Sequence, residues 1–255
     1  MKKIIYMCFL FLLILFLNSC ASGHNGFPNY SIPNILPIDS FVKVEIHISL
    51  SKCTEDGCFS QKALGHGSGS IISNLVSGSY VLTAGHVCEE NNLKEEALKN
   101  KFDFVMSLEV VDIDGLRYSA KVVKINSSLD TCIMFIKGLA KPSLRLKNII
   151  PKMGEKVYNV AAPAAIFSTN MVPILEGRYS GILEPYGLAV YTIPAIGGSS
   201  GSPVVNNSGE LVGMIHSVHR LFPHVSFSPK TDDLYVFVYD CLLYTSDAAD
   251  EEDSV

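Results

Sequence analysis

Three serines stand within four positions in the segment AIGGSSGSPVV, which covers residues 195–205. Ser199, Ser200 and Ser202 lie among glycines, and such a loop can be inert or can hold one activated nucleophile. A serine hydroxyl becomes a useful nucleophile when an imidazole within hydrogen-bonding distance removes its proton and a carboxylate orients that imidazole. The segment therefore raises the question of which histidine and which acid could serve one of these serines.

One histidine and one aspartate earlier in the chain suit such a set. His86 follows the apolar stretch YVLTAG, and Asp130 precedes the apolar stretch TCIMF. Both stretches are predicted strands, so both side chains would be placed at strand ends. An acyl intermediate would also need backbone N–H groups directed at its oxyanion, and glycines allow a loop to present them. The order along the chain is histidine, aspartate, serine.

The elements that must position these residues have the pattern of an all-β protein. Residues 41–50 alternate apolar and polar side chains with a period of two. Many short segments of this kind, punctuated by Gly and Pro, favour a β-barrel or a sandwich. The other predicted strands are 67–73, 79–85, 103–113, 117–125, 132–138, 155–163, 172–183, 187–196, 202–205, 210–218 and 233–240. Only residues 88–100 favour a helix, and residues 139–150 could join two halves.

With these motifs in order, the chain resembles the trypsin-like (chymotrypsin-fold) serine proteases of bacteria. The resemblance covers residues 65–240. The segments that carry it are T-A-G-H at 83–86, the Asp-containing strand at 130–136, G-E-K-V-Y-x-x-A-x-P at 154–163 and G-x-S-G-S-P at 198–203. It implies an all-β fold of two six-stranded antiparallel Greek-key β-barrels with the active site in the cleft between them. The peptidase domain would span 41–240, with the first barrel at about 41–138 and the second at about 151–240.

Carried over by motif, His86 is the general base, Asp130 orients it, and Ser200 is the nucleophile, since the nucleophile is the third residue of G-x-S-G. The backbone N–H groups of Gly198 and Ser200 would form the oxyanion hole. The resemblance implies a serine endopeptidase that hydrolyses peptide bonds through an acyl-enzyme, with no metal or organic cofactor. Two alternatives stay open: a catalytically silent binding lipoprotein of the same fold, and an esterase that uses the same triad.

A competing pattern in the same loop would nominate Ser199. Residues 197–201 also satisfy G-x-S-x-G, the nucleophile elbow of α/β-hydrolases. That fold requires an acid and then a histidine after the serine, whereas every histidine after residue 200 precedes Asp232. The alternation of helices and strands that the α/β-hydrolase fold requires is also missing, so the sequence favours Ser200.

The resemblance says less about specificity. Pro194 stands six residues before Ser200, where Arg- and Lys-cleaving members place an acidic pocket base, so a basic P1 residue is not expected. His216 and Val218 fall near the strand that lines the pocket. A histidine close to this position contacts the substrate carboxylate in Glu-specific bacterial relatives. A small or apolar P1 residue, a Glu P1 residue and simple packing of His216 in its strand all stay open.

The N-terminus predicts export. Two lysines precede an apolar run over residues 4–17, which is shorter than the roughly 20 residues that a spanning helix needs. This favours a signal peptide over residues 1–19. Leu17-Asn18-Ser19-Cys20 resembles a bacterial lipobox, which implies that Cys20 is lipidated and holds the protein on a membrane of the cell envelope. Ordinary cleavage, with secretion, and an uncleaved anchor are the alternatives. Residues 20–40 are predicted to be a tether.

The net charge of −5 lies at the C-terminus, because the last fifteen residues carry five acidic side chains and no basic one. The rest of the chain is neutral, so neither a nucleic-acid-binding surface nor a strongly acidic one is implied. Residues 241–255 resemble the translation of an adapter used in preparing sequencing libraries. They are expected to be a foreign tail in place of the native C-terminus, and the alternative is a natural acidic tail.

Four cysteines remain when the signal peptide and the tail are set aside. Cys53 and Cys58 flank the turn-like tetrapeptide TEDG, which favours a disulfide between them in an oxidising compartment. Cys88 and Cys132 could be free buried thiols or a second bridge. A metal site made of all four would lack paired C-x-x-C spacing, so no metal is expected.

Overall fold

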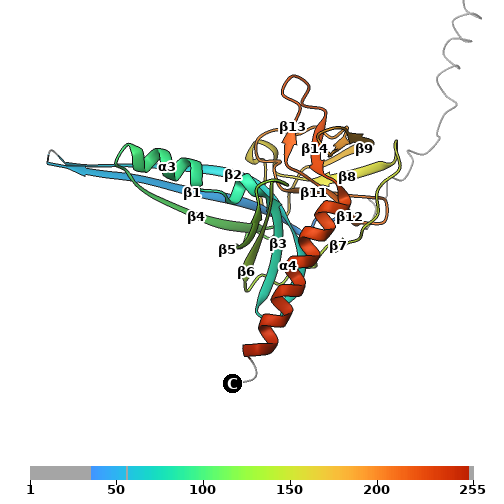
Figure 1. The fold of residues 1–255 in the computed structure, drawn as a ribbon, viewed down its shortest axis with the longest axis horizontal. Coiled ribbons are helices and arrows are strands. Elements are labelled where there is room, and N and C mark those ends of the chain that lie inside the picture. Colours follow the sequence, from blue (N-terminus) through green and yellow to red (C-terminus); the bar gives the residue numbers. More distant parts are fainter. Residues whose placement is uncertain (1–35, 56, 253–255) are drawn as a thin grey trace, which may run out of the picture. The chain divides into compact units, whose positions relative to one another are not determined.

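The first half of the described chain forms a closed barrel of six antiparallel strands (Figure 1). The structure is a computed structural model that describes residues 36–55 and 57–252. The predicted signal peptide, Cys20 and most of the predicted tether lie outside these residues. The barrel strands are β1 (Phe41–Thr54), β2 (Gly57–Leu75), β3 (Gly78–Ala84), β4 (Asp103–Asp112), β5 (Arg117–Asn126) and β6 (Thr131–Lys137). Their order around the barrel is β1-β2-β3-β6-β5-β4, which confirms the prediction of a six-stranded antiparallel barrel.

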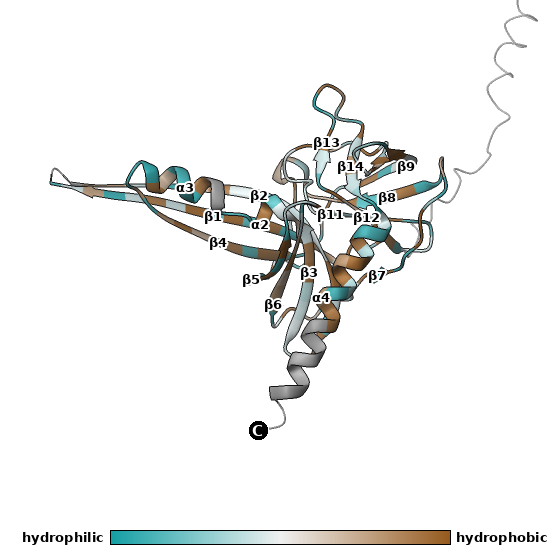
Figure 2. Cartoon of the chain, in the orientation of Figure 1, coloured by the Kyte–Doolittle hydropathy of each residue, from teal (hydrophilic) through white to brown (hydrophobic). Residues whose placement is uncertain are grey.

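Side chains that face the core of this barrel follow the strand period of two. In β1, Val42 and Val44 are fully buried, while Lys43 between them points to the opposite face. Figure 2 shows the same alternation of hydrophobic and hydrophilic residues along β1. The pattern that predicted residues 41–50 as a strand therefore also fills the barrel.

Strands β1 and β2 are longer than the sequence pattern predicts. They pair along all 14 residues of β1, and a disulfide between Cys53 and Cys58 joins their ends (S–S 2.02 Å). Residues 51–54 and 57–66 carry mostly polar or small side chains, so no apolar alternation marks them, and backbone pairing alone makes them strands. Helix α3 (Asn91–Lys99) lies beside β4, within the predicted helical range 88–100 (Figure 1).

The second half forms a sheet of eight strands in the order β13-β14-β10-β9-β8-β11-β12-β7. They are β7 (Arg145–Leu146), β8 (Lys156–Val160), β9 (Ile174–Leu183), β10 (Leu188–Tyr191), β11 (Ser202–Val205), β12 (Glu210–Ile215), β13 (Ser217–Val218) and β14 (Ser226–Pro229), with a 3₁₀ turn η1 (Pro163–Ala165) after β8. The sheet curls until the end of β12 meets β14, where the His216 N–H donates to Phe227 O (3.0 Å). The strands from β14 to β12 thus form the second barrel of a chymotrypsin-like fold.

The last element is helix α4 (Thr231–Glu252), where the sequence pattern predicted a strand at 233–240. Asp232 and Asp233 stand in its first turn, where carboxylates interact favourably with the helix dipole. Its buried side chains recur every three or four residues, as in a helix packed on one face. They are Leu234, Phe237, Val238 and Cys241. The strand prediction is wrong because a short apolar run fits the period of a strand and the period of a helix equally well. The helix continues beyond residue 240, where the peptidase domain was predicted to end, and buries Cys241.

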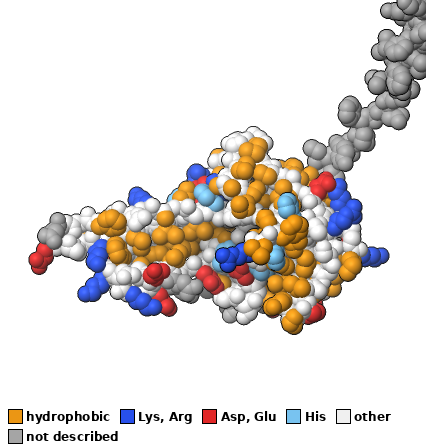
Figure 3. Space-filling view, turned by 90° about the horizontal axis from the view of Figure 1, so that it is seen from above, with side chains coloured by type: hydrophobic (Ala, Val, Ile, Leu, Met, Phe, Trp, Pro, Cys, Tyr) orange, Lys and Arg blue, Asp and Glu red, His pale blue; other side chains and the backbone are white. Residues whose placement is uncertain are grey.

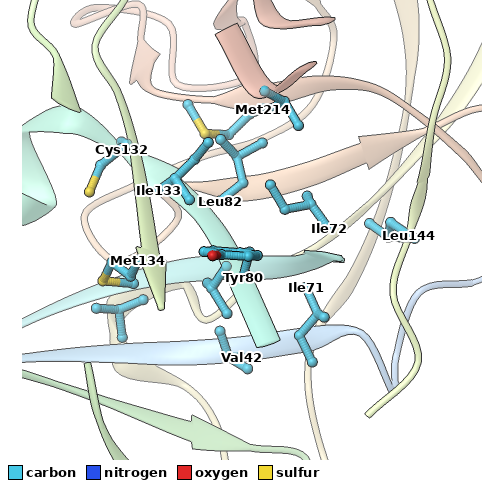
Figure 4. Packing of buried hydrophobic residues seen from close by; sticks show 14 of the residues in the cluster. Val42, Ile71, Ile72, Tyr80, Leu82, Cys132, Ile133, Met134, Leu144 and Met214 are labelled. Atoms are coloured by element: carbon cyan, nitrogen blue, oxygen red, sulfur yellow. The ribbon is translucent and has the colours of Figure 1, made fainter. Parts of the chain in front are cut away.

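A shared hydrophobic core joins the two barrels and α4. Met214 of β12 packs with Leu82 of β3 and Ile133 of β6, and the three side chains point toward one another (Figure 4). Phe237 of α4 belongs to the same cluster. Burial of each such side chain stabilises the fold by roughly 1.5–3 kcal/mol. Within the described ranges, no helix is both long and apolar enough to cross a membrane.

A second disulfide lies next to the predicted catalytic residues. It joins Cys88, at the end of the one-turn helix α2 (Gly85–Cys88), to Cys132 of β6 (S–S 2.04 Å). The sequence left open whether these two cysteines are bridged. His86 precedes one of them by two residues, and Asp130 precedes the other by two. The bridge therefore holds together the two segments that carry the histidine and the aspartate.

The two disulfides are expected to differ in their effect on stability. Replacing both Cys88 and Cys132 with Ala opens a link across 44 residues and should lower the free energy of unfolding by about 4 kcal/mol. Replacing both Cys53 and Cys58 with Ala opens a link across only 5 residues at the end of a hairpin and should lower it by less than about 2 kcal/mol. Denaturant unfolding of the two double variants measures both values, and equal losses would contradict this ranking.

Candidate active site

The pairing of β3 with β6 brings His86 and Asp130 together. Ala84 at the end of β3 pairs with Thr131 at the start of β6, so α2 begins beside the residue that precedes β6. His86 Nδ1 lies 2.8 Å from Asp130 Oδ2, and the backbone N–H of His86 donates to Asp130 Oδ1 (2.7 Å). A side chain at Gly85 would meet the same carboxylate, because its Cβ would lie 2.9 Å from Asp130 Oδ1. The glycine of T-A-G-H is thus explained by close approach of the aspartate.

Asp130 has an unusual backbone conformation, with φ of 50°. Aspartate tolerates this left-handed region better than most residues. The preceding turn is held by Asn126, whose Oδ1 accepts hydrogen bonds from the N–H groups of Ser128 (3.0 Å) and Leu129 (3.1 Å). The turn therefore fixes the direction in which the Asp130 carboxylate leaves the chain.

Two histidines determine the protonation of this carboxylate. Burial raises the pKa of Asp130, but the nearby ring of His216 and the hydrogen bonds from the His86 ring and the His86 N–H outweigh it, and the pKa lies well below its ordinary value. The hydrogen bond to Asp130 in turn raises the pKa of His86, and partial burial opposes this only in part. The pair is thus an ionised acceptor beside an imidazole that gains a proton easily, as a general base requires.

The structure places His216 beside Asp130. His216 Nδ1 lies 3.4 Å from Asp130 Oδ2, the same oxygen that contacts His86. The His216 side chain is 12% exposed, and its Nε2 has no hydrogen-bond partner among the described residues. The contact with Asp130 was not foreseen from the sequence, whereas the role predicted for His216 in a substrate pocket stays a prediction.

The three serines within residues 195–205 differ in their surroundings. Ser199 is 1% exposed, and its hydroxyl accepts a hydrogen bond from the N–H of Ile196 (3.3 Å). Ser202 is fully buried, and its hydroxyl accepts one from Asn159 Nδ2 (2.8 Å). Ser200 is partly exposed, and its hydroxyl makes no hydrogen bond within the described part of the chain. Of the three, only Ser200 has a side chain free to react.

Glycines allow the Ser200 loop to approach the first barrel closely. Gly201 has φ of 89°, and a Cβ there would overlap Ser68 O and Thr83 Oγ1. The carbonyl of Ser200 accepts a hydrogen bond from the N–H of Ser68 in β2 (2.8 Å). A Cβ at Gly67 would lie 3.0 Å from Val87, which follows His86, and 3.4 Å from Ser200 O. The loop therefore lies against the same part of β2 as the segment that carries His86.

No hydrogen bond joins the Ser200 hydroxyl to the His86 ring in the described residues. The His86 side chain is 49% exposed, so its ring is accessible from solvent. Hydrogen bonds between a nucleophile and its base are often long in sites without substrate and shorten when substrate binds. The structure thus joins His86 to Asp130 directly and places the Ser200 loop against the neighbouring strand β2.

Two peptide planes in the loop are each held through their carbonyl, while their N–H groups remain unpaired among the described residues. The carbonyl of Gly197 accepts from Ala164 N–H (2.7 Å), and that of Ser199 accepts from Ser202 N–H (3.0 Å). The amides in the same two planes are those of Gly198 and Ser200, and neither donates to an acceptor within the described ranges. Gly198 has φ of 95°. These are the two N–H groups predicted to form the oxyanion hole.

Pro194 and Val218, which were predicted to line the pocket, both lie next to the segment between β13 and β14. Ala195 N–H, adjacent to Pro194, donates to Pro223 O (2.9 Å), and Val218 pairs with Ser226. Figure 3 looks onto this side of the molecule and shows hydrophobic side chains and histidines together. Exposed hydrophobic residues of the region are Ile196, Leu221 and Phe222.

One further cluster has side chains of the kind that bind metals. Glu45, His47 and Glu109 place their ligand atoms within 4.8 Å of one another on the outside of the first barrel. Lys43 lies 2.9 Å and Arg117 lies 2.5 Å from the carboxylate of Glu45. These cations already neutralise the cluster, so a metal ion would have to displace them.

Comparison with known proteins identifies the family. The model of the trypsin-like peptidase domain matches residues 67–214, which contain His86, Asp130 and Ser200. A search of curated proteins gives no match.

Two solved structures share the fold. The inactive form of a serine-to-alanine mutant of Rv3671c from M. tuberculosis H37Rv has a TM-score of 0.58 and 16% identity, over 84% of this chain and 94% of that one. The serine endoprotease from Yersinia pestis has a TM-score of 0.58 and 19% identity, over 80% of this chain and 63% of that one. At these identities the likeness concerns the fold alone.

The contact between His216 and Asp130 predicts a shift in pH dependence. His86 must be neutral to act as a base, so the rate at which a fluorophosphonate labels the protein should fall as pH drops through the raised pKa of His86. His216→Leu removes a donor from Asp130, and the more basic carboxylate should raise the pKa of His86 further. The acid limb of the profile, the pH range in which the labelling rate falls, should then move to higher pH by roughly half a unit or more.

His216→Asn is the matched control, because its amide N–H can occupy the position of Nδ1–H. Its acid limb should stay near that of the wild type. A limb that stays in place or moves to lower pH in His216→Leu would contradict the assigned contact.

Proposed function

This chain belongs to the trypsin-like peptidase family, and we propose that it is a serine endopeptidase that works through His86, Asp130 and Ser200. The observation that carries the proposal is the hydrogen bond between His86 and Asp130, beside a loop with one free serine hydroxyl and two free amides. The family membership and the likeness to serine protease structures support hydrolysis of peptide bonds as the activity. Protein or peptide chains are accordingly its proposed substrates.

In the proposed reaction, the Ser200 hydroxyl attacks the carbonyl carbon of the scissile peptide bond. His86 Nε2 takes the hydroxyl proton, and Asp130 stabilises the imidazolium that forms while keeping Nδ1 as the protonated nitrogen. The imidazolium then donates its proton to the leaving amine, which leaves an acyl group on Ser200. A water molecule, deprotonated by His86, hydrolyses this ester and restores the free enzyme.

Negative charge develops on the substrate oxygen during both attacks. The N–H groups of Gly198 and Ser200 are proposed to receive it, since both are free and stand in planes held by other bonds. Fixed donors of this kind need no reorganisation when the charge appears. Loss of one such donor lowers kcat by about 10²–10³-fold in enzymes of this mechanism.

The nucleophile is tested by labelling with a fluorophosphonate. The wild type should be labelled, and Ser200→Ala should lose labelling and peptidase activity by about 10⁴-fold or more. Ser199→Ala is the control, because the hydroxyl of Ser199 is buried in a turn and should not react. A folded wild type without labelling would overturn the enzyme assignment, and undiminished labelling of Ser200→Ala would overturn the role of Ser200.

Digestion of a peptide library then separates a peptidase from an esterase with the same triad. We expect cleavage of peptide bonds, and no preference for Arg or Lys before the cleaved bond, because Pro194 stands where an acidic pocket base would be needed. Hydrolysis of esters without any cleavage of peptides would favour the esterase.

We also propose that the enzyme is exported and held on a membrane of the cell envelope through a lipid on Cys20. The lipobox-like Leu17-Asn18-Ser19-Cys20 supports this proposal. Mass spectrometry of the protein from a bacterial host should find Cys20 as a lipidated N-terminus, and Cys20→Ser should abolish both the lipid and membrane association. A mature N-terminus at another residue would contradict it.

A further inference from the structure

Ser68 of strand β2 contacts both barrels at the point where they meet. It is fully buried, and the sequence analysis did not single it out. Its hydroxyl donates a hydrogen bond to the carbonyl of Gly198 (2.7 Å) and accepts one from the N–H of Ala162 (3.0 Å). One side chain of the first barrel thus binds two separate segments of the second.

The backbone of Ser68 adds two further bonds at the same place. Its N–H donates to the carbonyl of Ser200 (2.8 Å), and its carbonyl accepts from the hydroxyl of Thr83 in β3 (2.7 Å). Thr83 stands two residues before Gly85 and so belongs to the T-A-G-H motif. Ser68 is therefore held in the barrel that carries His86 and is bonded directly to the loop that carries Ser200.

The hydrogen bond from the Ser68 hydroxyl ends on the Gly198 carbonyl, within residues 197–200, which we call the oxyanion loop because the N–H groups of Gly198 and Ser200 are the proposed oxyanion hole. The carbonyl of Gly198 and the N–H of Ser199 belong to one planar peptide group. Ser68 holds its carbonyl end, and Ile196 O accepts from its N–H end (2.9 Å). This plane lies between the two peptide planes that carry the free N–H groups of Gly198 and Ser200, so its rotation would change the direction of both N–H groups.

We propose that Ser68 is a positioning residue that, through its hydroxyl, sets the direction of the N–H groups of Gly198 and Ser200. The proposal rests on the proposed function and extends it, since Ser68 forms no hydrogen bond with the His86 ring or the Ser200 hydroxyl in the described part of the chain. Without this hydroxyl, the 198–199 peptide group keeps only one of its two anchors, and the N–H of Ala162 loses its partner. Stabilisation of the oxyanion should then fall, while the His86–Asp130 pair is unchanged.

Ser70 provides a matched control on the same strand. It lies two residues from Ser68, on the same face of β2, and is also fully buried. Its hydroxyl has no hydrogen-bond partner among the described residues. Ser68→Ala and Ser70→Ala therefore remove the same atom from equally buried positions, and only the first breaks bonds to the oxyanion loop.

The experiment compares both variants with the wild type in peptide hydrolysis. For Ser68→Ala we expect kcat to fall about 10- to 100-fold, less than the loss of an oxyanion donor outright. KM should stay within about twofold, because a group that acts only in the transition state changes kcat. The acid limb of the pH profile should not move. Ser70→Ala should behave as the wild type does.

A second readout isolates the oxyanion. A peptide aldehyde adds to the serine and forms an oxyanion, whereas the matching peptide alcohol does not. The affinity of Ser68→Ala for the aldehyde should fall by about the same factor as kcat, and its affinity for the alcohol should be unchanged. Ser68→Cys, which keeps a weak donor, should give intermediate values and covers the case in which Ser68→Ala does not fold.

Each outcome decides one question. Equal activity of Ser68→Ala and Ser70→Ala, beside an active wild type, would overturn the role of Ser68 and leave the proposed function intact. A shifted acid limb, a raised KM or an equal loss of affinity for aldehyde and alcohol would also overturn it, since the effect would then lie outside the oxyanion loop. A folded wild type that hydrolyses no peptide would overturn both proposals.

Discussion

The hydrogen bonds from β2 to the carbonyls of Gly198 and Ser200 are the constraint on which the site depends. His86 and Asp130 stand on the first barrel and Ser200 on the second, so the proposed catalytic groups meet only if the two barrels keep a fixed relation at this point. The shared core around Met214 stabilises the packing of the two barrels, but apolar contacts are non-directional and do not fix how one barrel is oriented against the other. Hydrogen bonds at the junction supply that direction.

Electrostatics and packing act together at Asp130. The carboxylate would be costly to bury alone, and it is stabilised by hydrogen bonds from His86 and by the nearby ring of His216. The same contacts keep it ionised beside the imidazole that must accept a proton. The pairing of β3 with β6 and the disulfide between Cys88 and Cys132 hold the two segments in place. Stability and chemistry therefore rest on the same few bonds.

Local pattern accounts for much of the fold and fails where two patterns coincide. The alternation in residues 41–50 predicted β1, because one face of that strand is buried. Residues 51–54 and 57–66 belong to strands that no alternation marks, since backbone pairing defines them. The stretch 233–240 fits a strand and a helix equally well, and only its packing against the core decides for α4. A short apolar run cannot be assigned to a strand or a helix without the residues that pack against it.

The order of the chemical groups, His86, Asp130 and a serine in a glycine-rich loop, follows from the amino-acid sequence alone. The sequence also favoured Ser200, because spacing within a motif is a local property. The contact of His216 with Asp130 and the hydrogen bond of Ser68 to the Gly198 carbonyl become visible only in the folded chain. These contacts join residues that are 86 and 130 positions apart. A local sequence pattern cannot predict contacts between residues so far apart in the chain, because these residues meet only when the barrels close.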